Sequence, residues 1–372
     1  MIDELHKTWN IQKTHIAGDE FTGYESVYDQ LNFTKADYDA DPEGTIDSVF
    51  NIYRSVNLVP IVYYTEPGLV NAIRSFAHSK YNTVQGDVLG LGNNAGQTIN
   101  RFLFPNMMTA EPKGRGSNSL KDRFYNDAKL RRAIRICFEF RDGNNLVHPT
   151  AIRRALELVT GENVTNFKAQ NAKAIVEHLC PVLWGKVYDY SAGYGGRLLG
   201  ITSSNMRYNY VGIDPNTETV KHLNYLQSLI EEATGVSSEI YCTTSEEYEP
   251  EGIDCAFSSP PYFNLEKYSD EPTQCMVRYQ SLDEWFDGYV EPTISNAYKG
   301  LNSDGVFATN IADYKSYGNK EYAVVDRWIE TAEKLGFKHV DTIKMMLNTR
   351  PGVGNNKTDG REKYEGVYVF KK

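Results

Sequence analysis

The run of the sequence with the clearest chemical potential is Ser259-Pro260-Pro261-Tyr262, which follows a short apolar stretch. Two consecutive prolines offer no backbone N–H, so a strand must end there in a rigid turn. The Ser259 hydroxyl and the Pro260 carbonyl could accept both N–H bonds of an amino group on a heteroaromatic ring. Such a group is a poor nucleophile because its lone pair is delocalised, and two acceptors would draw the nitrogen toward tetrahedral geometry. The run therefore indicates activation of an exocyclic amino nitrogen.

Aromatic side chains complete this turn. Tyr262, and with it Phe263, offers a flat face for a base drawn out of its stack, an interaction of roughly 1–3 kcal/mol. Serine is too weak a base to take the amino proton, so the proton would leave to water after the transfer. The structural alternative is a turn that only ends a strand and packs an aromatic ring.

A glycine-rich run from Asp189 to Gly200 lies earlier in the chain. Its glycines permit a tight turn and let a ligand approach the backbone. The next apolar run ends at Asp214, 18 residues after Gly196, where a carboxylate could hold the two hydroxyls of a ribose. The pattern G-x-G-x-x-G fails because Leu198 occupies its third position, which disfavours a pyrophosphate. Carboxylates at both strand ends favour S-adenosylmethionine as the ligand, because the positive charge of this cofactor suits Asp189. The alternative is a turn that uses glycine for its geometry alone.

Both runs fall at the ends of predicted strands in the second half of the chain. Strand and helix patterns alternate there, which is typical of a mostly parallel sheet with helices on both faces. Ligands bind beyond the carboxyl ends of such strands, so the two runs are expected at one edge of the sheet. The seven predicted strands are 182–189, 208–214, 239–243, 254–257, 305–311, 338–345 and 365–370. The predicted helices are 172–179, 193–201 (with its leading turn), 217–233, 282–301 and 322–335.

The first 160 residues carry no comparable run. Their patterns predict a mainly helical domain over 1–160, ahead of an α/β catalytic domain over 161–372. The predicted elements of the first domain and its border are a strand over 53–64, a helix over 65–79, a loop over 84–100 and a helix over 121–138.

Charge is unevenly distributed along the chain. The net charge is −10, yet residues 113–154 carry eleven Lys or Arg against four acids. A basic stripe on an acidic protein is typical of a phosphate-binding surface, and a solvated helix face is the alternative. The candidate phosphate contacts are Lys113, Arg115, Arg131, Arg132 and Arg135.

Composition excludes several classes of protein. A hydrophobic fraction of 41% and a charged fraction of 24% are ordinary for a globular protein that buries a core. The longest apolar stretch, 58–64, is far shorter than the ~20 residues of a membrane span. An N-terminus without an apolar segment and five cysteines without a C-x-x-C pair predict a cytoplasmic protein with reduced thiols. The seven histidines show no metal-ligand spacing, so no metal is expected.

The ordered pair D-x-x-A-G-x-G-G (189–196) and S-P-P-Y (259–262) resembles the class I S-adenosylmethionine-dependent DNA amino-methyltransferases, over about residues 163 to 372. The resemblance implies a seven-stranded Rossmann-like sheet, and methyl transfer to an amino nitrogen of a flipped base. It implies catalytic roles for Ser259, Pro260, Pro261 and Tyr262. The cofactor-binding residues that it implies are Phe167, Asp189, Ala192, Gly193, Gly195, Asp214, Pro215 and Ser245 or, in its place, Glu246. Lys168 replaces the proline that usually follows the aromatic residue at Phe167.

The resemblance also bears on the substrate. Serine at the first catalytic position favours cytosine N4 over adenine N6. The target, double-stranded DNA, would be recognised by residues 1–160 or by a partner, and a restriction endonuclease could accompany the enzyme. Two alternatives stay open: an RNA amino-methyltransferase, and a catalytically silent scaffold that binds DNA or a partner.

Overall fold

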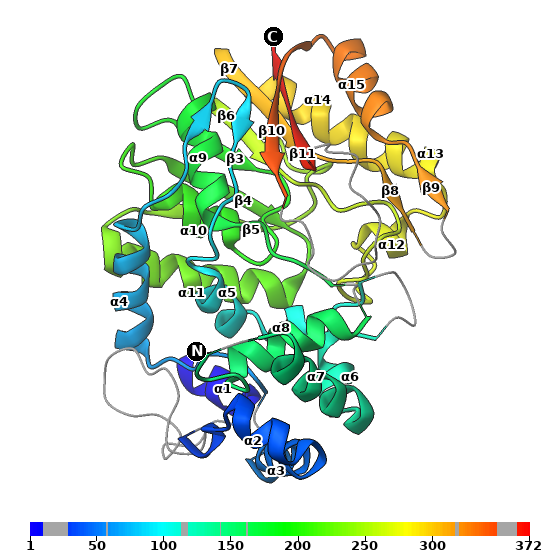
Figure 1. Ribbon diagram of the computed structural model, residues 1–372. Helices are drawn as coiled ribbons and strands as arrows, with labels where there is room; N and C mark the ends of the chain where they lie inside the picture. Colours follow the sequence, from blue (N-terminus) through cyan, green and yellow to red (C-terminus); the bar gives the residue numbers. More distant parts are fainter. Residues whose placement is uncertain are drawn as a thin grey trace. The chain divides into compact units, whose positions relative to one another are not determined.

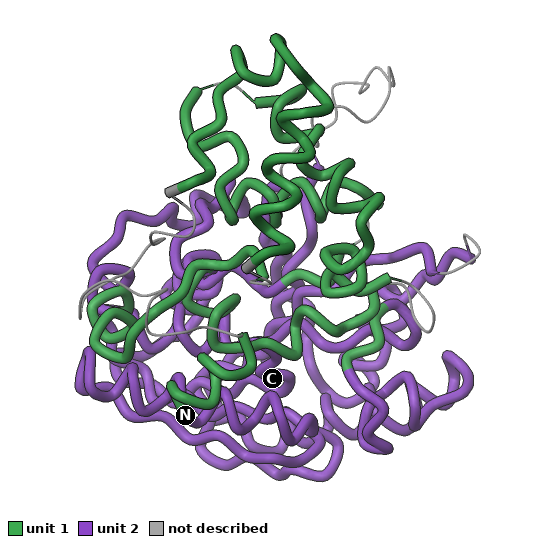
Figure 2. The backbone as a smooth tube through the Cα atoms, turned by 90° about the horizontal axis from the view of Figure 1, so that it is seen from below, with its two compact units in different colours: residues 1–73, 98–165, 266–268 green, residues 74–97, 166–265, 269–372 purple. Residues whose placement is uncertain are grey.

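The chain folds into two compact units, which Figure 2 colours separately. The computed structural model describes residues 1–9, 29–56, 59–112, 118–141, 143–160, 163–316, 320–347 and 363–372. Unit 1 comprises 1–73, 98–165 and 266–268, and unit 2 comprises 74–97, 166–265 and 269–372. Segments of the two units therefore alternate along the sequence.

Unit 1 is mainly helical in its described part, as the sequence predicts. The predicted helix over 121–138 is interrupted: Asn126 ends α6 and caps α7 through a hydrogen bond from Lys129 N to its Oδ1 (3.0 Å). The described α-helices of this unit are α1 (Ile2–Thr8), α2 (Lys35–Ala40), α3 (Pro42–Val56), α4 (Glu66–Ala77, up to Ile73), α5 (Gln97–Leu103, from its second residue), α6 (Leu120–Tyr125), α7 (Asp127–Glu139) and α8 (Pro149–Thr160).

The strand predicted over 53–64 is wrong. Its first residues belong to α3, and the described residues 59–64 form no strand. Apolar residues follow the helical period from Ile46 through Val49 to Tyr53, and all three are buried. This amphipathic face decides the conformation, because it packs α3 against α7.

Unit 2 is built around one sheet with the strand order β1-β2-β10-β11-β7-β6-β3-β4-β5 (Figure 1). The last five strands of this order run parallel, and β11 is antiparallel to both of its neighbours. The mostly parallel α/β sheet predicted from the sequence is thereby confirmed. The seven longer strands are β3 (Lys186–Asp189), β4 (Asn209–Asp214), β5 (Ser238–Cys242), β6 (Ile253–Ser258), β7 (Leu301–Asn310), β10 (Lys338–Met346) and β11 (Tyr364–Lys371).

The sheet has nine strands rather than the predicted seven. The additional pair is a hairpin of β1 (Val84–Gln85) and β2 (Val88–Leu89), inside the segment predicted as a loop, and β2 runs parallel to β10. Lys344 fastens it, since its backbone N donates to Asp87 O (2.7 Å) and its Nζ to Asp87 Oδ2 (2.6 Å). Two-residue strands are too short to show an alternating pattern, so the sequence alone gives no sign of them.

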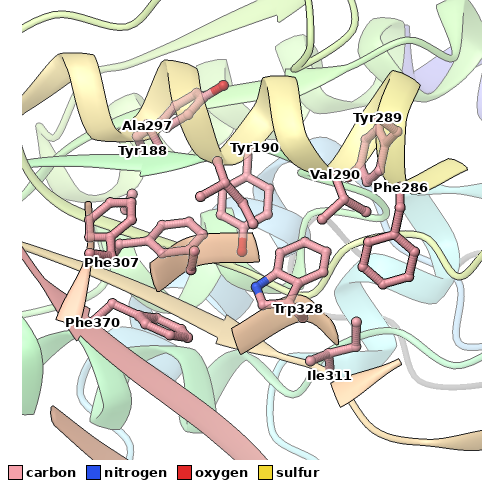
Figure 3. Close-up of a cluster of buried hydrophobic side chains, with 14 of the residues drawn as sticks. Tyr188, Tyr190, Phe286, Tyr289, Val290, Ala297, Phe307, Ile311, Trp328 and Phe370 are labelled. Atoms are coloured by element: carbon pink, nitrogen blue, oxygen red, sulfur yellow. The ribbon is translucent and has the colours of Figure 1, made fainter. Parts of the chain in front are cut away.

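Helices cover both faces of the sheet. On one face, an aromatic core joins α14 and α15 to Tyr188 of β3, to Tyr190 directly after it, to Phe307 of β7 and to Phe370 of β11 (Figure 3). On the other face, α10 lies next to Asp189, and α9 packs against α10. The helices of unit 2 are α4 (Glu66–Ala77, from Arg74), α9 (Ala169–Leu179), α10 (Gly196–Thr202), α11 (Thr217–Thr234), α12 (Cys275–Arg278), α13 (Leu282–Trp285), α14 (Glu291–Gly300, after a π-helical turn) and α15 (Val325–Lys334).

Candidate active site

The order of the strands reverses beside β3, which has β4 and β5 on one side and β6 and β7 on the other. In sheets of this kind, ligands bind outside the carboxyl ends of the strands at such a reversal. Here β3 ends at Asp189, and β6 ends at Ser258, directly before Ser259. Ser258 Oγ donates a hydrogen bond to Asp189 Oδ1 (2.7 Å), which joins the two strand ends. The two sequence motifs are therefore neighbours in space, as predicted.

Asp189 is fully buried, and protein donors surround its carboxylate. Besides Ser258, Arg197 Nε (2.8 Å) and Tyr210 OH (2.7 Å) donate to Oδ2, and Ser191 N donates to Oδ1 (3.3 Å). The sequence predicts that Asp189 faces a positively charged cofactor. In the structure the cation beside it is Arg197 of the same chain.

Arg197, Tyr210 and Ser258 are site residues that the motifs alone do not reveal. The Arg197 guanidinium also donates to the Ser191 carbonyl and lies 5.6 Å from the centroid of the Phe167 ring. Burial lowers the pKa of Arg197, but the charge and hydrogen bond of Asp189 outweigh burial and leave this pKa above its ordinary value. One signal was available in the sequence: a lone charged residue in the first turn of an otherwise apolar helix, α10.

The glycine loop before α10 requires its glycines. Gly195, the N-terminal cap of α10, has a φ of 70°, which disfavours residues with a Cβ. The chain before α9 passes very close to Gly196: a Cβ there would lie 2.1 Å from the Phe167 carbonyl oxygen, so no side chain fits at this position. Phe167 itself is half-buried, and its ring meets that of Phe257 edge-on with centroids 5.6 Å apart. The predicted cofactor-covering aromatic thus lies against the glycine loop and Arg197.

Asp214 ties the loop to the end of β4. Its Oδ2 accepts from Gly193 N and its Oδ1 from Asn216 N, both at 2.9 Å, while Ala192 N donates to Ile213 O (2.8 Å). The side chain is half-buried, and burial raises the pKa of Asp214 to about 6. Each carboxylate oxygen keeps accepting capacity beyond these bonds, which is what two ribose hydroxyls would need.

The raised pKa of Asp214 makes stability depend on pH in a predictable direction. Because folding raises the pKa from 3.8 to about 6, the folded state holds the proton more tightly, and this site loses stability as pH rises from about 4 to about 6. The loss is at most about 3 kcal/mol, and less because the carboxyl is partly exposed. We expect wild-type stability, relative to Asp214→Asn, to be lower at pH 7 than at pH 4. Urea unfolding of both proteins without ligand tests this, and a pH-independent difference would contradict it.

The residues expected near an adenine follow the ends of β4 and β5. Ser245 is buried, and its hydroxyl lies 3.0 Å from Thr293 Oγ1 of α14. Glu246 Oε1 accepts from Arg278 Nη1 and Tyr279 OH, both at 2.9 Å, and burial raises the pKa of Glu246. Both side chains already have protein partners. Pro215, the third predicted residue, is half-buried directly after Asp214.

The turn predicted to be catalytic leaves the Ser259 side chain partly accessible. Ser259 is half-buried, and no described residue hydrogen-bonds its hydroxyl; Pro260 is buried and Pro261 half-buried. Tyr262 is half-buried, its OH accepts from Ala312 N (3.1 Å), and its ring meets the Tyr314 ring edge-on with centroids 4.7 Å apart. The turn thus combines an open hydroxyl with a fixed aromatic ring.

Phe263 departs from the predicted substrate-binding role. It is 7% exposed and packs in the core, edge-on to Tyr322, with ring centroids 6.0 Å apart. Tyr322 belongs to a short hairpin, β8 (Tyr314–Lys315) and β9 (Glu321–Tyr322), that closes over Phe263. The aromatic face of the turn is therefore left to Tyr262.

The predicted phosphate contacts in unit 1 are partly neutralised. Arg131 forms an ion pair with Asp47 and Arg135 forms one with Glu43, so acids of α3 compensate two of the three arginines of α7. Arg132 is exposed, without an ion pair to any described residue. Lys113 and Arg115 lie outside the described residues. The basic stripe is therefore less positive than the composition of 113–154 predicts.

Within the described ranges, no group of His, Cys, Asp or Glu side chains is arranged to hold a metal ion. Nor does any helix there combine the length and apolar character needed to cross a membrane. All five cysteines are unpaired.

The structure resembles solved S-adenosylmethionine-dependent methyltransferases at low identity. The TehB-like S-adenosylmethionine-dependent methyltransferase from Corynebacterium glutamicum is 15% identical, with a TM-score of 0.34, over 60% of this chain and 96% of that one. TrmN from Thermus thermophilus is 15% identical, with a TM-score of 0.36, over 55% and 48%. Aeropyrum pernix fibrillarin, solved with bound S-adenosylmethionine, is 13% identical, with a TM-score of 0.34, over 54% and 73%. No protein-family model and no curated protein matches the chain.

Proposed function

We propose that this protein transfers a methyl group from S-adenosylmethionine to an exocyclic amino nitrogen of a base in DNA, with cytosine N4 as the favoured target. The observation that carries the proposal is the hydrogen bond from Ser258 to Asp189 (2.7 Å), at the reversal of the strand order. It brings a turn suited to an amino group next to a glycine loop suited to a nucleoside.

The residues at the strand ends fit the cofactor best on its ribose side. Asp214 offers carboxylate oxygens there, and Gly193 beside it has no side chain to obstruct a sugar. Asp189 contributes indirectly in this proposal. Arg197 balances its negative charge and also donates a hydrogen bond to the Ser191 carbonyl, so the pair fixes the glycine loop. When bound, S-adenosylmethionine supplies an electrophilic methyl group.

The turn after β6 would prepare the amino group. Ser259 Oγ and the Pro260 carbonyl accept its two N–H bonds, which frees the nitrogen lone pair for attack. Tyr262 stacks on the flipped base and holds it against these acceptors. The proton then leaves to water, since a serine hydroxyl is too weak a base to keep it.

Methyl transfer to DNA can be tested directly. Labelled S-adenosylmethionine is incubated with the protein and unmethylated duplex DNA, the DNA is digested to nucleosides, and the products are identified by mass spectrometry. N4-methylcytosine is the expected product. N6-methyladenine would support methyl transfer to DNA but identify adenine as the target base. If RNA is labelled and DNA is not, the substrate is RNA; if the cofactor binds and no methyl group is transferred, the protein is a silent scaffold.

Replacing Arg131, Arg132 and Arg135 together with alanine should weaken duplex binding and flatten its salt dependence. Each arginine that no longer neutralises a phosphate should reduce the slope of log K against log salt by about 0.9. Fluorescence anisotropy with a labelled duplex at several salt concentrations measures this slope. Because Glu43 and Asp47 compensate two of these arginines, Glu43→Ala with Asp47→Ala is the matched control and should strengthen binding. A salt slope that is unchanged in both variants would show that the arginines of α7 contact no phosphate and belong to a solvated helix face.

A further inference from the structure

A buried amide nitrogen without a partner among the described residues lies in the segment that follows β6, near the loops after β4 and β5. Gln274 immediately precedes α12 and is only 7% exposed. No hydrogen-bond partner is present for its side-chain Nε2 among the residues that the structure describes. Buried donors are almost always paired in folded proteins, so an unpaired one calls for an explanation such as a ligand.

The segment that carries Gln274 is fastened to the loop after β4. The Glu271 carboxylate accepts from Thr217 Oγ1 (2.6 Å), and Thr273 Oγ1 donates to the Pro215 carbonyl (3.4 Å). Residues 271 and 273 thus hold the chain beside Pro215, which directly follows Asp214. Gln274 is the next residue along.

The far side of the same segment is fastened to the loop after β5. Tyr279 OH and Arg278 Nη1 both reach Glu246 Oε1 at 2.9 Å. Burial is the main cause that raises the pKa of Cys275, and the carboxylates of Glu246 and Asp214 both raise it further. The segment 271–279, which includes Gln274, is therefore tied at one end to the loop after β4 and at the other to the loop after β5.

We propose that Gln274 Nε2 donates a hydrogen bond to a ring nitrogen of the cofactor's adenine. The inference rests on the proposed function, in which Asp214 holds the ribose and the adenine lies toward β5. The ring nitrogens of adenine accept hydrogen bonds and cannot donate them. Ser245 and Glu246 are engaged by Thr293, Arg278 and Tyr279, whereas Gln274 Nε2 has no partner among the described residues.

The test is calorimetric titration of wild-type protein and Gln274→Leu with S-adenosylhomocysteine and its 1-deaza, 3-deaza and 7-deaza analogues. Leucine keeps the approximate size of glutamine and removes the donor. We expect Gln274→Leu to bind S-adenosylhomocysteine about tenfold more weakly, as loss of one buried hydrogen bond implies. One deaza analogue should bind wild-type protein about tenfold more weakly than S-adenosylhomocysteine does. The variant should bind that analogue and S-adenosylhomocysteine equally, because it already lacks the hydrogen bond that the analogue removes.

Thermal unfolding of the ligand-free proteins separates this role from a structural one. Removing an unpaired buried donor should leave the midpoint of Gln274→Leu unchanged or raised, while binding weakens. Equal binding of S-adenosylhomocysteine by both proteins would overturn the role of Gln274 alone, as would equal losses for every analogue. No binding to the wild-type protein would overturn the proposed function as well.

Discussion

Replacing Arg197 with methionine should destabilise the protein by about 3–5 kcal/mol, the range found when one partner of a buried ion pair is removed. Methionine occupies a similar volume but leaves the fully buried Asp189 carboxylate without its cation. The Ser191 carbonyl would lose its guanidinium donor in the same step. Urea unfolding monitored by circular dichroism gives the change in the free energy of unfolding.

The matched control is the double variant Asp189→Asn with Arg197→Met. Asparagine keeps an oxygen for Tyr210 or Ser258 while it removes the negative charge. If the charge pair governs the loss, the double variant should be more stable than the sum of the single changes predicts, by about 0.5–3 kcal/mol. Strictly additive losses would show that Arg197 acts through packing alone.

Replacing Tyr262 with alanine should lower turnover about 5- to 150-fold, which corresponds to the loss of roughly 1–3 kcal/mol of base stacking. The affinity for S-adenosylhomocysteine should stay unchanged, because the proposed contact of Tyr262 is with the base. Steady-state methylation of duplex DNA and calorimetry with S-adenosylhomocysteine measure the two effects separately.

Tyr262→Phe distinguishes the ring from the hydroxyl. Phenylalanine retains the stacking face and removes only the oxygen that accepts from Ala312 N. We expect Tyr262→Phe to recover most of the turnover that Tyr262→Ala loses. A tenfold loss of cofactor affinity in Tyr262→Ala, or equal turnover losses in both variants, would count against a stacking role.

The sequence predicts the sheet well because its longer strands and helices alternate with clear periods. The prediction misses the hairpin at residues 84–89. Each of its strands has only two residues, and its position in the sheet depends on the pairing of β2 with β10. It is also wrong for 53–64, where β-branched and aromatic residues look like a strand. The apolar period that continues from Ile46 makes the start of that segment helical.

For the candidate site, the motifs predict which strand ends adjoin but not what each side chain contacts. Asp189 and Ser258 are 69 residues apart in sequence, and no local pattern encodes their hydrogen bond. Likewise, the burial of Phe263 depends on Tyr322 in a distant hairpin. Such contacts arise from tertiary packing, so only the folded chain reveals them.

The alternation of the two units along the sequence limits how the protein can be shortened. A fragment cut to begin at residue 161 would lack residues 74–97, which belong to unit 2 and include both hairpin strands. Strand β10 would then present Lys344 and Met345 as an open edge, a template on which another chain can add a strand. A catalytic fragment for crystallography or display should therefore retain 74–97, for example by circular permutation, to avoid self-association.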